Sequence, residues 1–439
     1  MTIESVCPVC LKRLSAVKER DGDRVFLCKT CPEHGEFRTL IWNGPPNYDS
    51  WRRNRPEVLP AHTHTREDRG CPYDCGICPE HRQNTCCVLL EVTQRCSLGC
   101  PVCFASSGIT NAPDPSQEEI AGWYDLLMES GGPFNIQLSG GEPTMRDDLP
   151  ALIRIGKEKG FPFFQLNTNG LRLAAEPSYA IKLKEAGLDC VFLQFDGLQD
   201  STYSALRGRP LLREKLAAID ACAEVGLGVV LVPTVAAGIN DGDIGAVLDF
   251  AVVRMPEIRG VHFQPMSYFG RYPGELGGRL TIPDMLRKIE EQTSSHMKVS
   301  DFSPGSAENP YCSFSAAYLL QPDGSLKSLG KKEEGCCCGG DASRSRRYVA
   351  KHWSAAPSSG RCGSLREVEP QSFDDFIDRT RQYKLAVSGM VFQDAWNLDL
   401  DRLRQCYIHI VSPDRRVIPF CAYNLTGADG NTIYRGIKL

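Results

Sequence analysis

Cysteines constrain the fold of this chain more than any other residue type. The sequence of 439 residues contains 21 of them, and most stand within four residues of another. The amino terminus lacks the charged start and apolar stretch of a signal peptide, so we expect a cytoplasmic protein whose thiols stay reduced. Closely spaced, reduced cysteines are typical ligands of metals and iron–sulfur clusters. The chain is therefore expected to fold around several metal centres.

Strand-like and helical patterns alternate between residues 88 and 270. Short apolar runs of β character occur at 88–93, 134–138, 163–168, 190–195, 228–235 and 260–265. Helical patterns occur between them, at 116–130, 147–159, 178–186, 211–225 and 241–253. This alternation predicts an α/β fold with a parallel sheet and helices outside it. Because these strands are too few for a closed eight-stranded barrel, we expect a partial, open (β/α)6 barrel over 88–270.

The remaining sequence predicts three further regions. Residues 1–50 should form a cysteine-rich, zinc-ribbon or rubredoxin-like domain, and residues 51–87 a linker that carries a second cysteine group. Residues 271–439 should form a C-terminal domain with more cysteines, including a helix at 373–384. A chain of this length is normally divided into two or three domains.

The composition excludes two classes of protein. The net charge of −4, from 50 basic and 54 acidic residues, leaves no basic surface for a nucleic acid. No apolar run approaches the roughly 20 residues that a transmembrane helix needs, so we expect no transmembrane segment and leave peripheral membrane contact open.

Cys96, Cys100 and Cys103 are the cysteine group with the most specific setting, because they directly follow the first strand of the predicted barrel. Three thiolates at these spacings can hold three irons of a [4Fe–4S] cluster. The fourth iron then has no protein ligand and is free to bind a reacting small molecule. We therefore expect these three residues to form the catalytic centre.

Gly140, Gly141 and Glu142 end the second predicted strand. Two glycines allow a ligand to approach the backbone closely, and the glutamate supplies a hydrogen-bond acceptor. A turn of this kind is a weak signal alone, but ligands of open parallel sheets gather at the carboxyl ends of the strands. Its position after the cysteine triplet therefore predicts that it binds the same small molecule.

Cys7, Cys10, Cys28 and Cys31 form two pairs, each with two residues between its cysteines. Two such pairs are typical of one tetrahedral metal bound by four thiolates. The spacing does not distinguish zinc, which would be structural, from iron, which could also transfer electrons.

Cys71, Cys75 and Cys78 repeat the spacing of the catalytic triplet. They lack a preceding strand and a glycine-rich turn at the proper distance, so we expect them to bind an auxiliary [4Fe–4S] cluster that a fourth ligand closes. The candidates for that ligand are Cys86, as the nearest, with Cys87 and His81 as alternatives.

Cys312, Cys406 and Cys421 are candidates for a third cluster, although isolated cysteines are often ordinary core residues. Cys190 and Cys222 are expected to be core residues of that kind. The run 336–338 consists of three adjacent cysteines, which offer another ligand for the third cluster, redox-active thiols or an oxidation-prone loop.

The motifs together resemble part of a known superfamily. The catalytic triplet and the Gly-Gly-Glu-Pro turn resemble the radical S-adenosylmethionine (SAM) superfamily. With the N-terminal cysteine pairs, the segment 71–81 and the segment around Cys421, the chain is similar to the group that contains archaeal tetraether lipid synthase (Tes) and the class D radical SAM methylases. The triple cysteine at 336–338 resembles the bacterial TrsS subgroup.

This resemblance implies the cofactors SAM, a SAM-binding [4Fe–4S] cluster, two auxiliary [4Fe–4S] clusters and one mononuclear iron or zinc. Reductive cleavage of SAM would give a 5′-deoxyadenosyl radical that takes hydrogen from an unactivated carbon. The partners would be a small-molecule or lipid substrate and an electron donor such as ferredoxin or flavodoxin. The residues implied to contact SAM or the substrate are Gly140, Gly141, Glu142, Asn169, Gln194, Asp196, Arg207 and Val235.

We therefore expect a radical SAM enzyme that forms carbon–carbon bonds or methylates a lipid or pterin-like substrate. Two alternatives stay open. A radical SAM maturase of peptides usually has its extra cysteines after the barrel, whereas here a metal domain precedes it. A non-enzymatic iron–sulfur electron carrier would leave the Gly-Gly-Glu-Pro turn unexplained.

Overall fold

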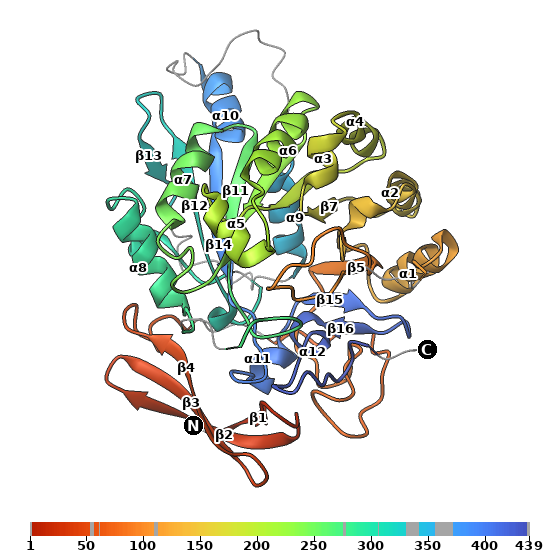
Figure 1. The fold of residues 1–439 in the computed structure, drawn as a ribbon, viewed down its shortest axis with the longest axis vertical. Coiled ribbons are helices and arrows are strands. Elements are labelled where there is room, and N and C mark those ends of the chain that lie inside the picture. The colour runs from red at the N-terminus through yellow and green to blue at the C-terminus, as the bar shows by residue number, and fades with distance from the viewer. Residues whose placement is uncertain are drawn as a thin grey trace.

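The computed structural model describes residues 2–52, 57–60, 62–108, 113–274, 278–305, 307–330, 342–355 and 372–436. Figure 1 shows a small N-terminal sheet packed against a larger body of strands surrounded by helices. The predicted cysteine run 336–338 lies outside the described residues.

The N-terminal sheet has four antiparallel strands in chain order: β1 (Thr2–Val6), β2 (Arg13–Asp21), β3 (Arg24–Cys31) and β4 (Gly35–Asn43). It is attached to the C-terminal part of the chain by buried polar contacts. Lys29 Nζ donates to the Ala395 carbonyl at 2.7 Å, and Ser5 Oγ donates to the Leu398 carbonyl at 2.6 Å. These contacts fix the N-terminal sheet to the body of the molecule.

Parallel strands form the centre of the body: β5 (Cys87–Thr93), β6 (Asn135–Gly140), β7 (Phe164–Thr168), β8 (Cys190–Gln194), β9 (Gly228–Val232) and β11 (Ile258–Pro265). The short strand β10 (Thr234–Val235) also pairs with β11. The helices between them are α1 (Gln117–Glu129), α2 (Leu149–Glu158), α3 (Leu171–Ala175), α4 (Ser178–Glu185), α5 (Asp200–Arg207), α6 (Leu212–Glu224) and α7 (Ile244–Val253). The predicted strands and helices of the partial barrel are confirmed, with ends shifted by a few residues.

The C-terminal strands extend the same sheet at both edges. Next to β11 lie β14 (Lys384–Met390), which is parallel to it, then β12 (Ser313–Leu320) and β13 (Leu326–Ser328). Next to β5 lie the parallel strand β15 (Ile408–Val411) and then β16 (Val417–Pro419). The sheet has 12 strands and ends at β13 and β16, so it stays open. The described strands of the C-terminal region therefore extend the sheet of the barrel.

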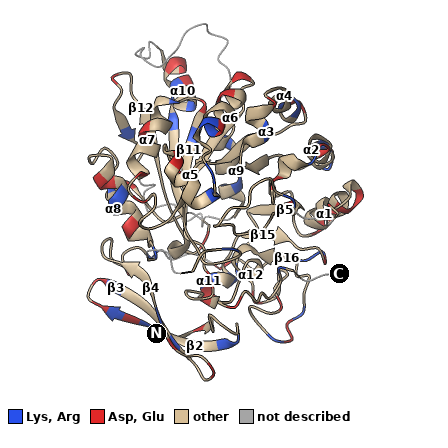
Figure 2. Cartoon of the chain, in the orientation of Figure 1, with Lys and Arg blue, Asp and Glu red and all other residues tan. Residues whose placement is uncertain are grey.

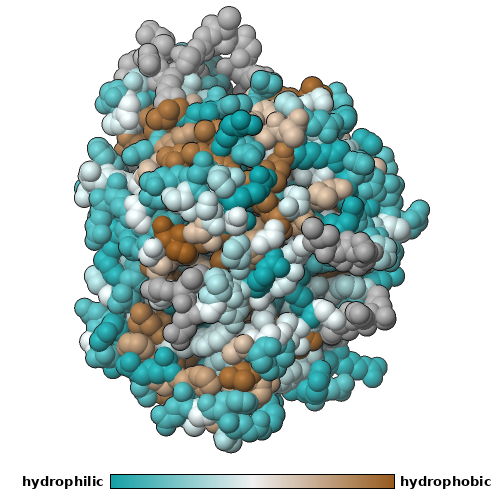
Figure 3. Space-filling view, viewed as in Figure 1, coloured by the Kyte–Doolittle hydropathy of each residue, from teal (hydrophilic) through white to brown (hydrophobic). Residues whose placement is uncertain are grey.

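The later helices are α8 (Ile282–Gln292), α9 (Ala342–Trp353), α10 (Phe373–Gln382), α11 (Leu400–Arg404) and α12 (Phe420–Tyr423). The predicted helix at 373–384 corresponds to α10. Charged residues of both signs occur on the outer helices and on the N-terminal sheet (Figure 2). Figure 3 shows a largely hydrophilic face with smaller hydrophobic patches. Among the described residues, every helix falls short of the length or hydropathy needed to cross a bilayer.

Burial on both faces explains the sequence of the central strands. All five residues of β9 are buried, as expected for a parallel strand that is covered on both sides. Helix α2 places Leu149, Leu152 and Ile153 on one buried face, at the spacing of an amphipathic helix. Gly156 continues that face, and a Cβ there would lie 2.2 Å from the Phe164 ring. The glycine thus lets α2 approach the sheet closely.

Candidate active site and metal centres

The cysteine triplet lies in the loop that follows β5, at the carboxyl end of the parallel strands. Cys96, Cys100 and Cys103 line one cavity of about 280 Å³ inside the barrel. Burial, with smaller contributions from Glu142 and the other two thiols, raises the pKa of Cys96 to about 11. Neutral, converging thiols of this kind release their protons when they bind a metal. The arrangement therefore fits a metal cluster.

Two arginines from other parts of the chain fix this loop. Arg271 exchanges backbone hydrogen bonds of 2.8 and 2.9 Å with Cys103, and its Nε donates to the Cys100 carbonyl at 2.7 Å. Arg207 Nη1 donates to the Val102 carbonyl at 3.0 Å. The two guanidinium groups also place positive charge beside the thiols, which favours their ionised form. Sequence reasoning missed Arg271, because no local motif surrounds it.

The glycine turn is packed against the same loop. A Cβ on Gly140, whose φ is +121°, would lie 2.1 Å from the Thr93 carbonyl, and one on Gly141 would lie 2.2 Å from the Arg95 carbonyl. The turn also donates two hydrogen bonds of 2.8 Å, from Gly141 N to Thr93 O and from Glu142 N to Arg95 O. Both glycines are therefore required by the close passage of the cysteine loop.

Glu142 connects the ends of two neighbouring strands. Its Oε1 accepts hydrogen bonds of 2.7 Å from the hydroxyls of Thr144 and Thr168, and its Oε2 accepts one of 2.6 Å from Asn169 N. The carboxylate lines the cavity and is 2% exposed. Since a carboxylate oxygen has two lone pairs, Oε2 keeps one acceptor position for a ligand amine.

Asn169, Gln194 and Arg207 also line the cavity, as expected. Asn169 Nδ2 is buried and has no hydrogen-bond partner among the described residues, so it is available to a ligand. Asp196 and Val235 were expected to contact the cofactor or substrate too, but neither lines the cavity.

Asp196 acts on the site through Arg207. Its carboxylate makes two hydrogen bonds of 2.7 Å with the guanidinium, and both side chains are buried. Burial raises the pKa of Asp196, but the Arg207 charge and its hydrogen bonds outweigh this and hold that pKa below its usual value. Val235 is 1% exposed and belongs to the hydrophobic core. Asp196 lies two residues beyond the end of β8, and the Arg207 guanidinium binds both of its carboxylate oxygens.

Lys215 is a second residue that the sequence did not reveal. Its Nζ is buried and donates to the Asn169 carbonyl at 2.6 Å and to Gln194 Oε1 at 3.2 Å. Burial lowers the pKa of Lys215 to about 8, although Asp196 opposes the shift. The lysine holds two cavity-lining residues in place.

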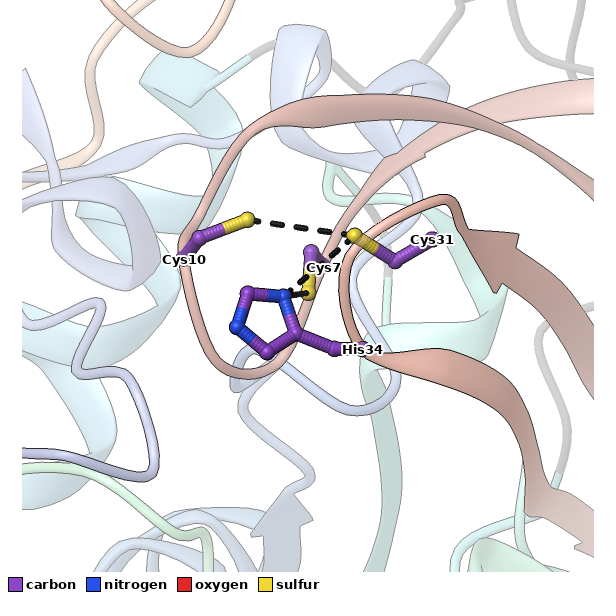
Figure 4. Close-up of side chains that lie close together, drawn as sticks. All are labelled: Cys7, Cys10, Cys31 and His34. Atoms are coloured by element: carbon purple, nitrogen blue, oxygen red, sulfur yellow. Dashed lines mark hydrogen bonds between the residues drawn. The ribbon is translucent and has the colours of Figure 1, made fainter.

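The predicted mononuclear centre lies in the N-terminal sheet and contains Cys7, Cys10, Cys31 and His34 (Figure 4). His34 Nδ1 lies 3.6 Å from Cys7 Sγ and 3.4 Å from Cys31 Sγ, and the Sγ atoms of Cys10 and Cys31 are 4.0 Å apart. A tetrahedral site with zinc–sulfur bonds of about 2.3 Å needs ligand separations of roughly 3.8 Å. Three thiolates and one imidazole therefore fit a single tetrahedral metal.

Cys28, which was also predicted as a ligand, does not belong to this group of converging side chains. Cys28 and Cys31 both lie in β3, and side chains an odd number of positions apart in a strand point to opposite faces. Cys28 faces Glu19 and Arg38 instead. His34 is the fourth side chain of the group. Two residues separate it from Cys31, a spacing that can be read from the sequence.

We predict that His34→Ala weakens metal binding at this centre, whereas Cys28→Ala leaves it intact. Loss of a direct ligand should lower the affinity by more than the roughly 10- to 100-fold that follows loss of a residue that only orients a ligand. The measurement is the zinc content of zinc-loaded protein during titration with a chelator. Equal loss of zinc from both variants would restore Cys28 as a ligand.

Cys71, Cys75 and Cys78 line a second, small pocket together with His81. His81 Nε2 is buried without a hydrogen-bond partner among the described residues, as a metal-binding nitrogen would be before the metal arrives. Cys86 and Cys87 line the central cavity instead. Of the three candidates for a fourth ligand, His81 is the one that lies beside these cysteines in the small pocket. Cys87 is the first residue of β5 and is paired with Asn135 of β6 and Ile408 of β15. It therefore lies at the amino-terminal end of the barrel strands, opposite the cysteine triplet.

Cys312, Cys406 and Cys421 are brought together from three separate segments. Each of the thiols of Cys406 and Cys421 interacts electrostatically with Cys312, and burial raises the pKa of both. Arg402 Nη2 lies 3.4 Å from Cys312 Sγ and supplies a buried positive charge. These contacts fit a cluster site, and they distinguish the three residues from Cys190 and Cys222, which are core residues as expected.

Comparison with known proteins agrees with this geometry. Residues 90–251 match the radical SAM superfamily, and residues 1–43 match the HMPTM N-terminal zinc ribbon domain. The chain is 34% identical to the 7,8-dihydro-6-hydroxymethylpterin dimethyltransferase of Methanocaldococcus jannaschii. The match covers 96% of this chain and 92% of that protein. It is 32% identical to the mitochondrial GTP 3',8-cyclase of Arabidopsis thaliana. That match covers 50% of this chain and 56% of the cyclase.

Among solved structures, the chain is similar to Streptococcus suis SuiB bound to the precursor peptide SuiA, with a TM-score of 0.41 and 17% identity over 49% of this chain and 47% of that one. The superfamily uses SAM and a [4Fe–4S] cluster, and the ribbon holds a mononuclear metal. The chain belongs to the radical SAM superfamily, in the family of the 7,8-dihydro-6-hydroxymethylpterin dimethyltransferase with an N-terminal zinc ribbon.

Proposed function

We propose that this radical SAM enzyme methylates a pterin-like substrate inside the barrel. One observation carries the proposal: the cysteine triplet, the Gly-Gly-Glu turn and a set of uncharged polar side chains line a single cavity. The identity to a pterin dimethyltransferase extends over nearly the whole chain, so it includes the metal-binding regions as well as the barrel.

Cys96, Cys100 and Cys103 would hold the cluster, which together with SAM supplies a 5′-deoxyadenosyl radical. The residues of this chain bind and orient the reactants. Glu142 Oε2 and Asn169 Nδ2 offer an acceptor and a donor at the carboxyl end of the strands. Apolar residues line most of the cavity surface and exclude the water that would quench a radical.

We further propose that the two remaining cysteine groups bind auxiliary clusters. Their sites are neighbours, because the His81 ring contacts the backbone of Cys406. A buried histidine between two cysteine groups provides a short path for electrons from a donor such as ferredoxin or flavodoxin. Such a donor is consistent with a cytoplasmic enzyme.

The test is an anaerobic assay of the reconstituted protein with SAM, dithionite, a methylenated folate as one-carbon donor and 6-hydroxymethyl-7,8-dihydropterin. We expect 5′-deoxyadenosine to form and the pterin to gain the mass of one or two methylene groups. Formation of 5′-deoxyadenosine with an unchanged pterin would refute the substrate. A lipid that gains mass under the same conditions would instead support the carbon–carbon bond-forming alternative.

A further inference from the structure

The cavity continues from the cysteine triplet into the barrel. A part of it, the inner chamber, is lined by side chains from β6, β7, β8 and β11 and from α9. On each strand the lining residues are two positions apart, as expected for one face of a strand. The residues of the inner chamber are Gln137, Gln165, Asn167, Phe192, His262, Gln264, Val349 and Trp353.

Helix α9 forms the floor of the inner chamber. It contacts β9, β11 and β14, and the Trp353 ring is stacked on Phe192 with a centroid distance of 5.2 Å and lies 5.8 Å from the His262 ring. Asn135 Nδ2, at the start of β6, donates to the Arg346 carbonyl of α9 at 3.1 Å. Helix α9 therefore packs across the amino-terminal end of the barrel strands.

Uncharged polar groups line the wall above this floor. Gln165 is 1% exposed, and its Oε1 has no hydrogen-bond partner among the described residues. Its Nε2 donates to Asn167 Oδ1 at 3.1 Å, which fixes the direction of the free carbonyl. Burial lowers the pKa of His262 to about 4, so this ring is neutral, and its Nδ1 lies 2.8 Å from Ser388 Oγ.

These features restrict the ligand. A buried carbonyl without a donor destabilises the protein unless a ligand supplies the missing hydrogen bond. A flat ring can supply an N–H group and pack against the aromatic floor at once. An alkyl chain would leave the carbonyl unpaired, and the floor would stop it after a short distance. The described side chains named here for the inner chamber are uncharged, so a neutral ligand matches them.

We propose that the inner chamber binds an uncharged, planar nitrogen heterocycle, and that Gln165 is the residue that selects it. This assignment rests on the proposed function and adds the position and recognition of the substrate. Gln165 accepts an N–H of the ring, and α9 sets the depth to which the ring can enter.

The test measures binding of 6-hydroxymethylpterin to the reconstituted holoenzyme with SAM, by anaerobic equilibrium dialysis. Gln165→Leu should weaken binding about tenfold or more, because the ring N–H then loses its acceptor in a site without water. Gln117→Leu is the matched control, since Gln117 is an exposed glutamine at the start of α1, and it should bind as the wild type does. Iron content and circular dichroism confirm that each variant is folded.

A second variant tests the floor. Trp353→Ala should admit dodecanol, which the wild type excludes. Equal binding of the pterin by wild type and Gln165→Leu would overturn the assignment of the inner chamber alone. If the wild type binds dodecanol but no pterin, both this assignment and the proposed substrate are wrong.

Discussion

The Cys100→Ala enzyme is expected to form no 5′-deoxyadenosine above background. Cys100 is one of the three cysteines of the loop after β5 that line the cavity, and the sequence of that loop contains no fourth cysteine. The loss of a direct ligand should exceed the roughly 10- to 100-fold effect of losing a residue that only orients one. The measurement is 5′-deoxyadenosine formed per protein in the presence of SAM and dithionite.

Cys222→Ala is the matched control for this variant. Cys222 is a buried cysteine on α6 that packs in the hydrophobic core. Its replacement removes one sulfur atom from the core and should cost about 1 kcal/mol of stability while leaving the product yield unchanged. Full activity of the Cys100→Ala enzyme would transfer the catalytic role to another cysteine group.

The Gly140→Ala enzyme is expected to lose both stability and activity. The new Cβ would lie 2.1 Å from the Thr93 carbonyl, so the strand end or the cysteine loop must move. Overpacking costs about 1–3 kcal/mol, and an alanine at positive φ adds roughly 1–2 kcal/mol. A displacement of the loop by about 1 Å is expected to lower the rate by roughly 100-fold. Urea unfolding and the 5′-deoxyadenosine assay measure the two effects.

Gly160→Ala separates the two causes. Gly160 also has a positive φ, of +93°, but a Cβ there would meet no atom within 4 Å. We expect this variant to lose only the roughly 1–2 kcal/mol of backbone strain and to keep its activity. If both glycine variants behaved alike, the close passage of the cysteine loop would have no role in the site.

Local patterns predicted the barrel and its catalytic end. Strands such as β5 and β9 are short, buried and contain valines, and helices such as α2 are amphipathic. Each of these elements can therefore be recognised from its own residues. The cysteine triplet and Glu142 were predicted because each follows directly on a strand. The carboxyl ends of parallel strands meet at one edge of a sheet, which brings these residues together whatever their distance in the sequence.

Ligand sets that depend on tertiary structure were predicted less well. Spacing alone assigned Cys28 to the mononuclear site and Cys86 to the first auxiliary site. In the structure His34 lies beside Cys7, Cys10 and Cys31, and His81 lies beside Cys71, Cys75 and Cys78. Cys28 faces away because of its position in β3, and Cys86 directly precedes β5 at the other end of the barrel strands. Which atoms converge on a point depends on strand pairing and loop path, which spacing does not specify.

The sequence by itself determined the order of strands and helices, the superfamily and the catalytic triplet Cys96, Cys100 and Cys103, since these are properties of continuous segments. Only the tertiary structure decided that β14 and β15 extend opposite edges of one sheet and that α9 packs against β9, β11 and β14. It also brought Arg271 to the cysteine loop. These contacts join residues far apart in the chain, and their free energy comes from burial and hydrogen bonds that form only when the whole sheet is assembled.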